Sequence, residues 1–251
     1  MSAISPFISA QPSTTSFTEI EWNGQCLSVE YQLITPVQIN SSEKIIFLHE
    51  GLGCVSMWKN FPEQLCRLVG MQGMVYSRPG YGKSSPLGNS PNWTADFMHL
   101  QAKEILPLIL KSLNWLNAEN SSEQKLHLLG HSDGASIAII FAAQFPQLLS
   151  TLTVLAPHTK VENITLEGIQ KARLAYLNGH MLAALSKHHQ NPQLCFESWS
   201  SIWLSEEFST WNLAAELRQL QCPVLAIQGF QDAYGTMEQI NEIQKLHSPT
   251  R

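Results

Sequence analysis

Short apolar runs that alternate with helix-length segments constrain the fold of this chain more than any other feature. Four such runs lie at residues 44–49 (KIIFLH), 126–129, 152–155 and 223–228 (PVLAIQ), and residues 135–145 form an apolar segment of helix length. Strands that are apolar throughout are typical of parallel sheets, because helices cover both faces of such a sheet. The pattern predicts an α/β fold with a mostly parallel, doubly wound sheet.

The N-terminal part of the chain predicts antiparallel strands that precede this pattern. Residues 17–22 and 27–34 are separated by Asn23-Gly24, a dipeptide typical of tight hairpin turns. Within residues 27–34, apolar and polar residues alternate, as expected for a strand with one buried face. The remaining patterns predict one further strand and two helices: residues 73–76, 96–116 (kinked or divided at Pro107) and 236–246.

The alternation of strands and helices stops after Pro157. Residues 159–220 have no strand pattern, so we interpret them as a helical cap inserted between two core strands. The α/β core would then comprise residues 17–158 and 221–251. A Ser/Thr/Pro-rich segment, residues 1–16, is expected to form a mobile tail.

Composition narrows the classes of function. Of the 251 residues, 44% are hydrophobic and only 14% are charged, which argues against a disordered or coiled-coil chain. A formal net charge of −5 offers no basic surface for nucleic acid. The longest apolar run, residues 135–143, is too short to span a membrane. A signal peptide would need a basic residue near the N-terminus, and no basic residue precedes Lys44. We therefore expect a cytoplasmic protein.

Cysteine and histidine spacing carries no metal signal. The five cysteines lack C-x-x-C spacing, so free thiols are expected, as in a reducing compartment. Neither a zinc-finger spacing nor an H-E-x-x-H segment occurs among the cysteines and nine histidines. We expect no metal and no cofactor.

The strongest chemical signal is the G-x-S-x-G segment GHSDG at residues 130–134. It lies between the apolar run that ends at Leu129 and the helical segment that begins near Ala135. In this strand–turn–helix context, small residues permit a sharp turn that presents Ser132 at the carboxyl edge of the sheet. The helix N-terminus there offers N–H groups and a positive dipole to a developing oxyanion. Ser132 is therefore the candidate nucleophile, and a glycine-rich turn without chemistry is the alternative.

A second glycine-rich segment, HEGLG at residues 49–53, follows the first apolar run of the parallel pattern. An oxyanion hole in this arrangement takes one backbone N–H from the residue after the nucleophile, here Asp133, and another from this earlier loop. Gly51 is the candidate for the second N–H, since a missing side chain lets the backbone approach a substrate carbonyl. A flexible loop without this role is the alternative.

Residues 17–250 resemble the α/β-hydrolase family, specifically its members with a cap. The resemblance rests on four features: the HEGLG loop, the segment SRPGYGKS at residues 77–84, the GHSDG segment, and the helical insertion before PVLAIQG. It implies an α/β-hydrolase fold and hydrolysis of a small-molecule substrate. The family usually has HG where this chain has His49-Glu50. Glu50 could orient the loop, recognise substrate, or have a solvated structural role.

The order of catalytic residues in this family is serine, acid, histidine. Asp232, in the turn after PVLAIQG, matches the position of the acid, which orients the histidine and stabilises its charged form. An aspartate that caps the next helix is the alternative. His247 is the only histidine after Asp232. Either the sequence ends before the strand and loop that would carry the base, or His247 supplies the base from a shortened C-terminus.

A serine rather than an aspartate as nucleophile argues against the dehalogenases and epoxide hydrolases that share this architecture. We therefore expect hydrolysis of a small carboxylic ester-like substrate through an acyl-enzyme on Ser132. A carbon–carbon bond hydrolase of aromatic degradation is one alternative. A non-catalytic ligand binder without the base is another.

The expected cap is rich in aromatic residues, namely Phe196, Trp199, Trp203, Phe208 and Trp211. They suggest an apolar group in the substrate, and the alternative is that they pack as core between cap and sheet without any ligand. His158 could line the pocket or serve as a hydrogen-bonded structural histidine. Asp133 would favour a cationic substrate if it faces the pocket, and would carry no such information if it caps the helix. The sequence leaves substrate identity and oligomeric state open.

Overall fold

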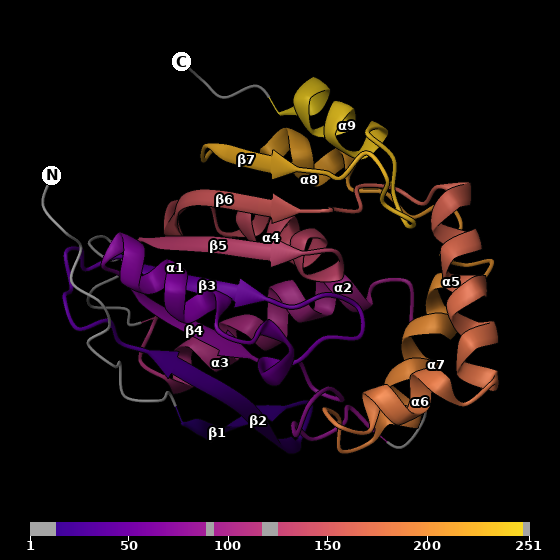
Figure 1. The fold of residues 1–251 in the computed structure, drawn as a ribbon. Coiled ribbons are helices and arrows are strands. Elements are labelled where there is room, and N and C mark those ends of the chain that lie inside the picture. Colours follow the sequence, from indigo (N-terminus) through magenta and orange to yellow (C-terminus); the bar gives the residue numbers. More distant parts are fainter. Residues whose placement is uncertain (1–13, 89–92, 117–124, 248–251) are drawn as a thin grey trace, which may run out of the picture.

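A seven-stranded sheet forms the centre of the protein (Figure 1). The computed structural model describes residues 14–88, 93–116 and 125–247. In the sheet the strands lie in the order β1 (Thr15–Trp22), β2 (Gln25–Ile34), β4 (Gln72–Tyr76), β3 (Lys44–Leu48), β5 (Leu126–His131), β6 (Leu149–Leu155) and β7 (Val224–Ile227). The pairs β1–β2 and β2–β4 are antiparallel, and every other neighbouring pair is parallel. The predicted mostly parallel sheet is confirmed.

The predicted hairpin joins β1 to β2. Asn23 and Gly24 both have left-handed backbone conformations, with φ of 47° and 74°, as the tight turn between two twisted strands requires. Strand β1 begins at Thr15, so its first two residues belong to the segment expected as a tail. Residues 1–13 of that expected tail lie outside the described residues.

Helices cover both faces of the sheet. On one face, the buried helix α4 (Asp133–Gln144) packs with the helices α2 (Phe97–Leu100), α3 (Leu106–Ser112) and α8 (Ala214–Gln219) in the larger hydrophobic core. On the other face, α1 (Phe61–Val69) packs against Phe47 and Val75 in a smaller core. Helix α9 (Glu238–Leu246) lies beside β7 and α8. Two short 3-10 turns span Val55–Trp58 and Pro146–Leu148.

The helix expected over residues 96–116 is divided, as Pro107 predicted. A π-helical segment, Gln101–Ile105, separates α2 from α3, and Pro107 lies in the first turn of α3. Proline lacks a backbone N–H and crowds the preceding turn, and a first-turn position avoids both problems. The wider π turn ends where the proline begins a new helix.

Three helices form the cap, which lies across the carboxyl ends of the parallel strands (Figure 1). They are α5 (Asn163–Leu177), α6 (His180–Leu185) and α7 (Pro192–Trp203). Helix α8 lies within residues 159–220, the segment predicted as the cap, but packs against α4 and α9 instead. No helix among the described residues is long and apolar enough to cross a membrane.

Candidate active site

Ser132 occupies a strained turn between β5 and α4. Its φ of 52° and ψ of −119° lie in a region that non-glycine residues rarely adopt. The glycines on either side permit the turn. At Gly130, an added Cβ would lie 2.3 Å from the carbonyl oxygen of Gly134, and at Gly134, an added Cβ would lie 2.1 Å from the carbonyl oxygen of Leu48. The Ser132 N–H donates to the Leu155 carbonyl at 2.9 Å, which holds the turn against β6. The strand–turn–helix geometry predicted for GHSDG is confirmed.

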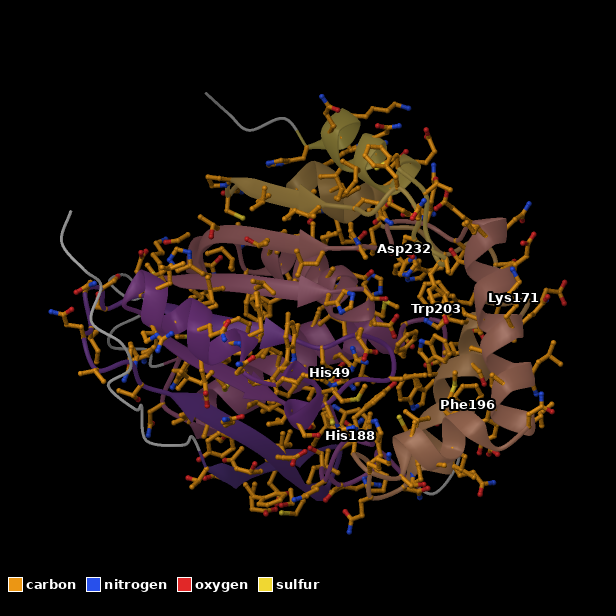
Figure 2. The ribbon with its side chains drawn as sticks, viewed as in Figure 1. His49, Lys171, His188, Phe196, Trp203 and Asp232 are labelled. Carbon is orange, nitrogen blue, oxygen red and sulfur yellow. The ribbon has the colours of Figure 1, made fainter. Side chains whose placement is uncertain are left out.

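A cavity of about 310 Å³ lies beside this turn, between the sheet edge and the cap. Ser132, Asp133, Gly51 and Asp232 all line it, so the structure brings four of the five predicted site residues together. Figure 2 places Asp232 and Trp203 at this junction of sheet and cap. The cavity is lined by Glu50, Gly51, Leu52, His131, Ser132, Asp133, Ala156, His158, Thr165, Ile169, Trp199, Trp203, Gln228, Asp232, Tyr234 and Gly235.

His247, the fifth predicted site residue, is not brought to the cavity. It follows the last residue of α9 and is absent from the cavity lining. Gln239, in the first turn of α9, contacts Thr159 at the end of the helix near the cavity. The nine residues of the helix extend over about 13 Å, so His247 follows the opposite end. Among the described residues, neither ring nitrogen of His247 has a hydrogen-bond partner.

Arg78 holds the loop that carries the candidate oxyanion donor. Its guanidinium is buried and donates to the carbonyl oxygens of His49 at 3.2 Å and Glu50 at 3.1 Å. Its backbone N–H donates to His49 Nε2 at 3.0 Å, and His49 Nδ1–H donates to the Glu50 carbonyl at 2.8 Å. Burial, with the Arg78 charge adding to it, lowers the pKa of His49 well below its usual value. His49 is therefore a neutral structural residue of the loop.

The side chains around Gly51 define the shape of the loop. The Glu50 carboxylate accepts a hydrogen bond from the Leu52 N–H, which supports the loop-orienting role among those considered for Glu50. A Cβ on Gly51 would lie 2.2 Å from Nε1 of Trp199. Any side chain at position 51 would therefore have to displace the Trp199 indole of the cap helix α7.

Asp133 faces the cavity. Its side chain is only 1% exposed, and Oδ2 lies 4.0 Å from Nη2 of Arg78. Burial raises the pKa of Asp133 to about 6, and the nearby Arg78 charge limits that rise. Among the described residues, Oδ2 has no hydrogen-bond partner. The carboxylate thus lies in the cavity wall next to the candidate nucleophile.

Asp232 lies in the loop between β7 and α9. Its Oδ1 accepts a hydrogen bond from the Tyr234 N–H at 2.8 Å. Glu162 of the cap segment holds the loop, because its carboxylate accepts hydrogen bonds from the Thr236 N–H at 2.9 Å and from the Thr236 hydroxyl at 2.6 Å. Fully buried Gln239 adds a second link, since its Oε1 accepts from the Thr159 N–H at 2.7 Å. These contacts fix a carboxylate at the cavity.

His158 is a buried lining residue whose ring packs on Trp203 with 4.9 Å between centroids. Burial lowers its pKa to about 4, although the charge of Asp232 opposes the shift. Its Nδ1 has no hydrogen-bond partner among the described residues, so the hydrogen-bonded structural role considered for it is not observed at that atom.

The aromatic residues of the cap segment pack mostly with one another. Phe208 stacks on Trp211 with 5.0 Å between ring centroids, and Trp203 meets Phe208 edge-on at 4.9 Å. Phe196 stacks on Tyr176 at 4.1 Å. Of the five aromatics singled out from the sequence, only Trp199 and Trp203 also line the cavity. The core alternative therefore accounts for the other three.

Comparison with known proteins is consistent with this architecture. A family model described as alpha/beta hydrolase fold matches residues 44–201, more than half of the chain. The chain belongs to the α/β-hydrolase family. Residues outside the match include the cavity residue Asp232 and all of α9.

Curated relatives of this α/β-hydrolase are distant. The 2-hydroxy-6-oxononadienedioate/2-hydroxy-6-oxononatrienedioate hydrolase of Escherichia coli (strain K12 / DH10B) is 24% identical over 151 residues, which cover 59% of this chain and 46% of the relative. The same match is found for this hydrolase from E. coli O139:H28 (strain E24377A / ETEC). The aligned region thus spans less than half the length of the curated relatives.

Solved structures share the fold of this α/β-hydrolase over nearly its whole length. Proline iminopeptidase from Mycobacterium smegmatis has a TM-score of 0.63 at 19% identity, and the match covers 94% of this chain and 88% of the other. The enol-lactonase from Burkholderia xenovorans LB400 has a TM-score of 0.66 at 16% identity, with 94% and 89% covered. At these identities the likeness establishes the fold alone.

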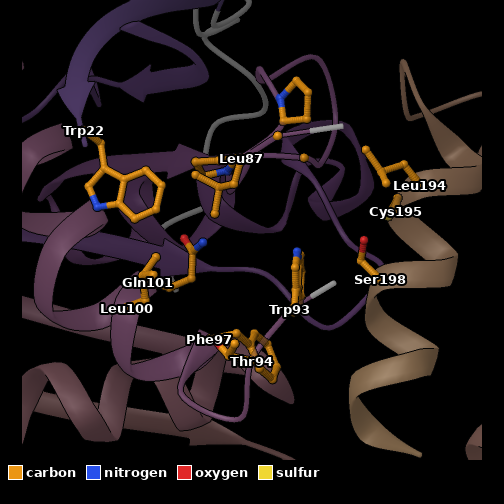
Figure 3. A pocket seen from close by; sticks show the side chains of 14 residues that line it. Trp22, Leu87, Trp93, Thr94, Phe97, Leu100, Gln101, Leu194, Cys195 and Ser198 are labelled. Carbon is orange, nitrogen blue, oxygen red and sulfur yellow. The ribbon is translucent and has the colours of Figure 1, made fainter. Parts of the chain in front are cut away.

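A second cavity of this α/β-hydrolase, about 190 Å³, lies elsewhere along α7 (Figure 3). It is lined by Trp22 from β1, Phe97 and Gln101 from the divided helix, and Cys195 and Ser198 from α7. None of the predicted site residues lines it. The candidate chemistry therefore belongs to the cavity beside Ser132.

Proposed function

We propose that this protein hydrolyses a small carboxylic ester-like substrate through an acyl-enzyme on Ser132. The observation that carries the proposal is the strained Ser132 turn, which lies in the wall of a cavity of about 310 Å³. In the same wall lie the Gly51 loop and the start of α4, the two expected sources of oxyanion N–H groups. Asp232 lines the wall as well.

In the proposed reaction, Ser132 Oγ attacks the substrate carbonyl and forms a tetrahedral intermediate. The backbone N–H groups of Gly51 and Asp133 stabilise its oxyanion, the alcohol leaves, and water then hydrolyses the acyl-enzyme. A base must accept the serine proton, and Asp232 would orient a histidine for this task. His247 is the only histidine after Asp232 in the sequence, although it lies outside the cavity lining.

Turnover of a series of short-chain p-nitrophenyl esters tests this proposal. We expect Ser132→Ala to abolish hydrolysis, with a fall of at least about 10³-fold, because the nucleophile is lost. Ser209→Ala, at an exposed position in the cap segment, is the matched control and should keep wild-type turnover. Equal hydrolysis by wild type and Ser132→Ala would refute the mechanism.

A carbon–carbon bond hydrolase is the second candidate function. It is favoured by the curated relatives, whose named substrates are 2-hydroxy-6-oxo dienedioates and trienedioates. Such a substrate is a conjugated dienol keto acid, so its cleavage can be followed by the loss of visible or near-ultraviolet absorbance. Turnover of this compound without turnover of simple esters would favour the second candidate.

A ligand binder without catalysis is the third candidate. It is favoured by the position of His247 outside the cavity lining. It predicts that ligands bind in the cavity while neither esters nor dienol keto acids are turned over. Turnover of either substrate class that depends on Ser132 would exclude it.

A further inference from the structure

The cavity beside Ser132 has an acidic lining. Three carboxylates, those of Glu50, Asp133 and Asp232, contribute to its wall, whereas no lysine or arginine does among the described residues that line it. His158 adds no positive charge at neutral pH, because burial holds its pKa at about 4. The residues that line the cavity therefore carry a net negative charge, which the buried Arg78 guanidinium 4.0 Å from Asp133 partly offsets.

Among the described residues, Asp133 is the one carboxylate of the three with a buried oxygen that accepts no hydrogen bond of normal geometry. The side chains of Trp203 and Trp199 lie close enough to lower its pKa without making such a bond. Glu50 accepts the Leu52 N–H, and Asp232 accepts the Tyr234 N–H at 2.8 Å. Asp133 Oδ2, in a side chain that is 1% exposed, has no hydrogen-bond partner among the described residues. A buried carboxylate oxygen without a donor is costly, so a donor from a ligand would be strongly favoured there.

Arg78 does not satisfy this oxygen. Its Nη2 lies 4.0 Å from Asp133 Oδ2, beyond hydrogen-bond distance. Its two terminal nitrogens donate instead to the carbonyl oxygens of His49 and Glu50, at 3.2 and 3.1 Å. Arg78 thus reduces the local charge without donating a hydrogen bond to Asp133 Oδ2.

The walls around Asp133 also suit a cation. Trp199, Trp203 and Tyr234 line the same cavity, and aromatic faces attract ammonium groups. Three further buried polar atoms of lining residues, His158 Nδ1, Trp203 Nε1 and Gln228 Oε1, have no hydrogen-bond partner among the described residues. Because buried polar atoms without partners are costly, the cavity is suited to a polar ligand rather than to a purely apolar one.

We propose that the substrate carries a protonated amine, which donates to Asp133 Oδ2 while the scissile carbonyl lies at Ser132. This inference rests on the proposed hydrolytic function and names the class of ester that the site selects. It also predicts that carboxylate substrates are disfavoured. The site would then differ in specificity from the curated relatives, which are named for dioates.

Binding of three ligands with matched chains tests this inference independently of turnover. Hexylammonium, hexan-1-ol and hexanoate have the same alkyl chain and differ in the charge and donor capacity of the polar group. Calorimetric titration of the full chain near neutral pH and at physiological ionic strength should show hexylammonium binding at least about tenfold more tightly than hexan-1-ol. Hexanoate should bind more weakly than either.

Variants assign the preference to one residue. Asp133→Asn should cost hexylammonium about tenfold in affinity and leave hexan-1-ol within about twofold, because only the charge is removed. Asp96→Asn, at an exposed aspartate outside this cavity, should change neither affinity. Ser132→Ala should also leave the order unchanged, so loss of turnover with an intact preference would refute the hydrolytic function alone.

The inference is overturned if wild type binds the three ligands with equal affinity, or binds hexanoate most tightly. It is likewise overturned if hexan-1-ol binds as tightly as hexylammonium, since a hydroxyl donor would then suffice. A preference for hexylammonium that survives in a folded Asp133→Asn variant would refute the assignment to Asp133. The wild-type comparison of the three ligands decides the charge preference even if that variant does not fold.

Discussion

Replacing Arg78 with methionine should destabilise the fold by about 3–5 kcal/mol at about pH 7.5. Methionine preserves most of the apolar stem and removes the guanidinium. The His49 carbonyl then loses the side-chain donor it has at 3.2 Å, and a buried acceptor without a donor costs about 1–3 kcal/mol. The Glu50 carbonyl keeps the Gly53 N–H at 3.1 Å and His49 Nδ1–H at 2.8 Å, so it contributes little to the cost.

The second part of this cost comes from Asp133, and it cannot exceed the free energy of protonating that carboxyl. Without Arg78, the pKa of Asp133 rises above its wild-type value of about 6, and the side chain is protonated instead of remaining charged. Protonating a group of pKa about 6 at about pH 7.5 costs about 2 kcal/mol, at about 1.4 kcal/mol per pH unit. Below about pH 6 the wild-type carboxyl is itself protonated, so this part of the cost disappears.

Urea unfolding of four proteins measures both parts: wild type, Arg78→Met, Asp133→Asn and the double variant. The coupling energy between the two substitutions should be about 2 kcal/mol at about pH 7.5 and close to zero at about pH 5. Arg67→Met, at an exposed arginine in α1, should change stability by less than about 0.5 kcal/mol. An Arg78→Met variant within about 1 kcal/mol of wild type, or a coupling that does not vary with pH, would refute the reasoning.

Three further predictions concern single residues. Gly134→Ala should destabilise the fold by more than about 3 kcal/mol in urea unfolding, since its Cβ would lie 2.1 Å from the Leu48 carbonyl oxygen; a stable variant would mean that the turn can relax. Gly51→Ala should displace the Trp199 indole, whose Nε1 would lie 2.2 Å from the new Cβ. We expect ester turnover to fall about tenfold or more and the near-ultraviolet circular dichroism spectrum to change. Wild-type turnover together with a wild-type spectrum would contradict this packing. His158 has a folded-state pKa of about 4 against an ordinary 6.5, so its contribution to stability falls by up to about 3 kcal/mol as the pH drops from 6.5 to 4. His158→Gln should lose this part of the pH dependence in urea unfolding, and an unchanged profile would show that the imidazole titrates normally.

The features that the sequence predicted well are those decided by local chemistry. Asn23-Gly24 predicted the hairpin because a tight turn requires two left-handed residues in succession. Gly130 and Gly134 predicted the turn at Ser132 because the crossing backbones leave no room for a Cβ. Pro107 predicted the division of a helix because it cannot occupy a helix interior.

The features that the sequence did not predict depend on the packing of distant segments. Nothing in the SRPGYGKS segment reveals that Arg78 is buried and holds the HEGLG loop, since its partners lie 28 and 29 positions away. Asp133 could cap α4 or face the cavity, and only the folded arrangement distinguishes the two. Helix α1 was not predicted, although Pro62 in its first turn and Gly70 at its C-terminal end, with φ of 67°, are local signals that could have revealed it.

Covalent labelling by a fluorophosphonate probe tests the central claim most directly, because only an activated serine hydroxyl attacks the phosphorus readily. Intact-mass measurement of the folded protein followed by peptide mapping should find one adduct, located on Ser132. The adduct should be absent from Ser132→Ala and retained in Ser209→Ala. A folded protein that acquires no adduct, or acquires it on another residue, would contradict the assignment of Ser132 as the nucleophile.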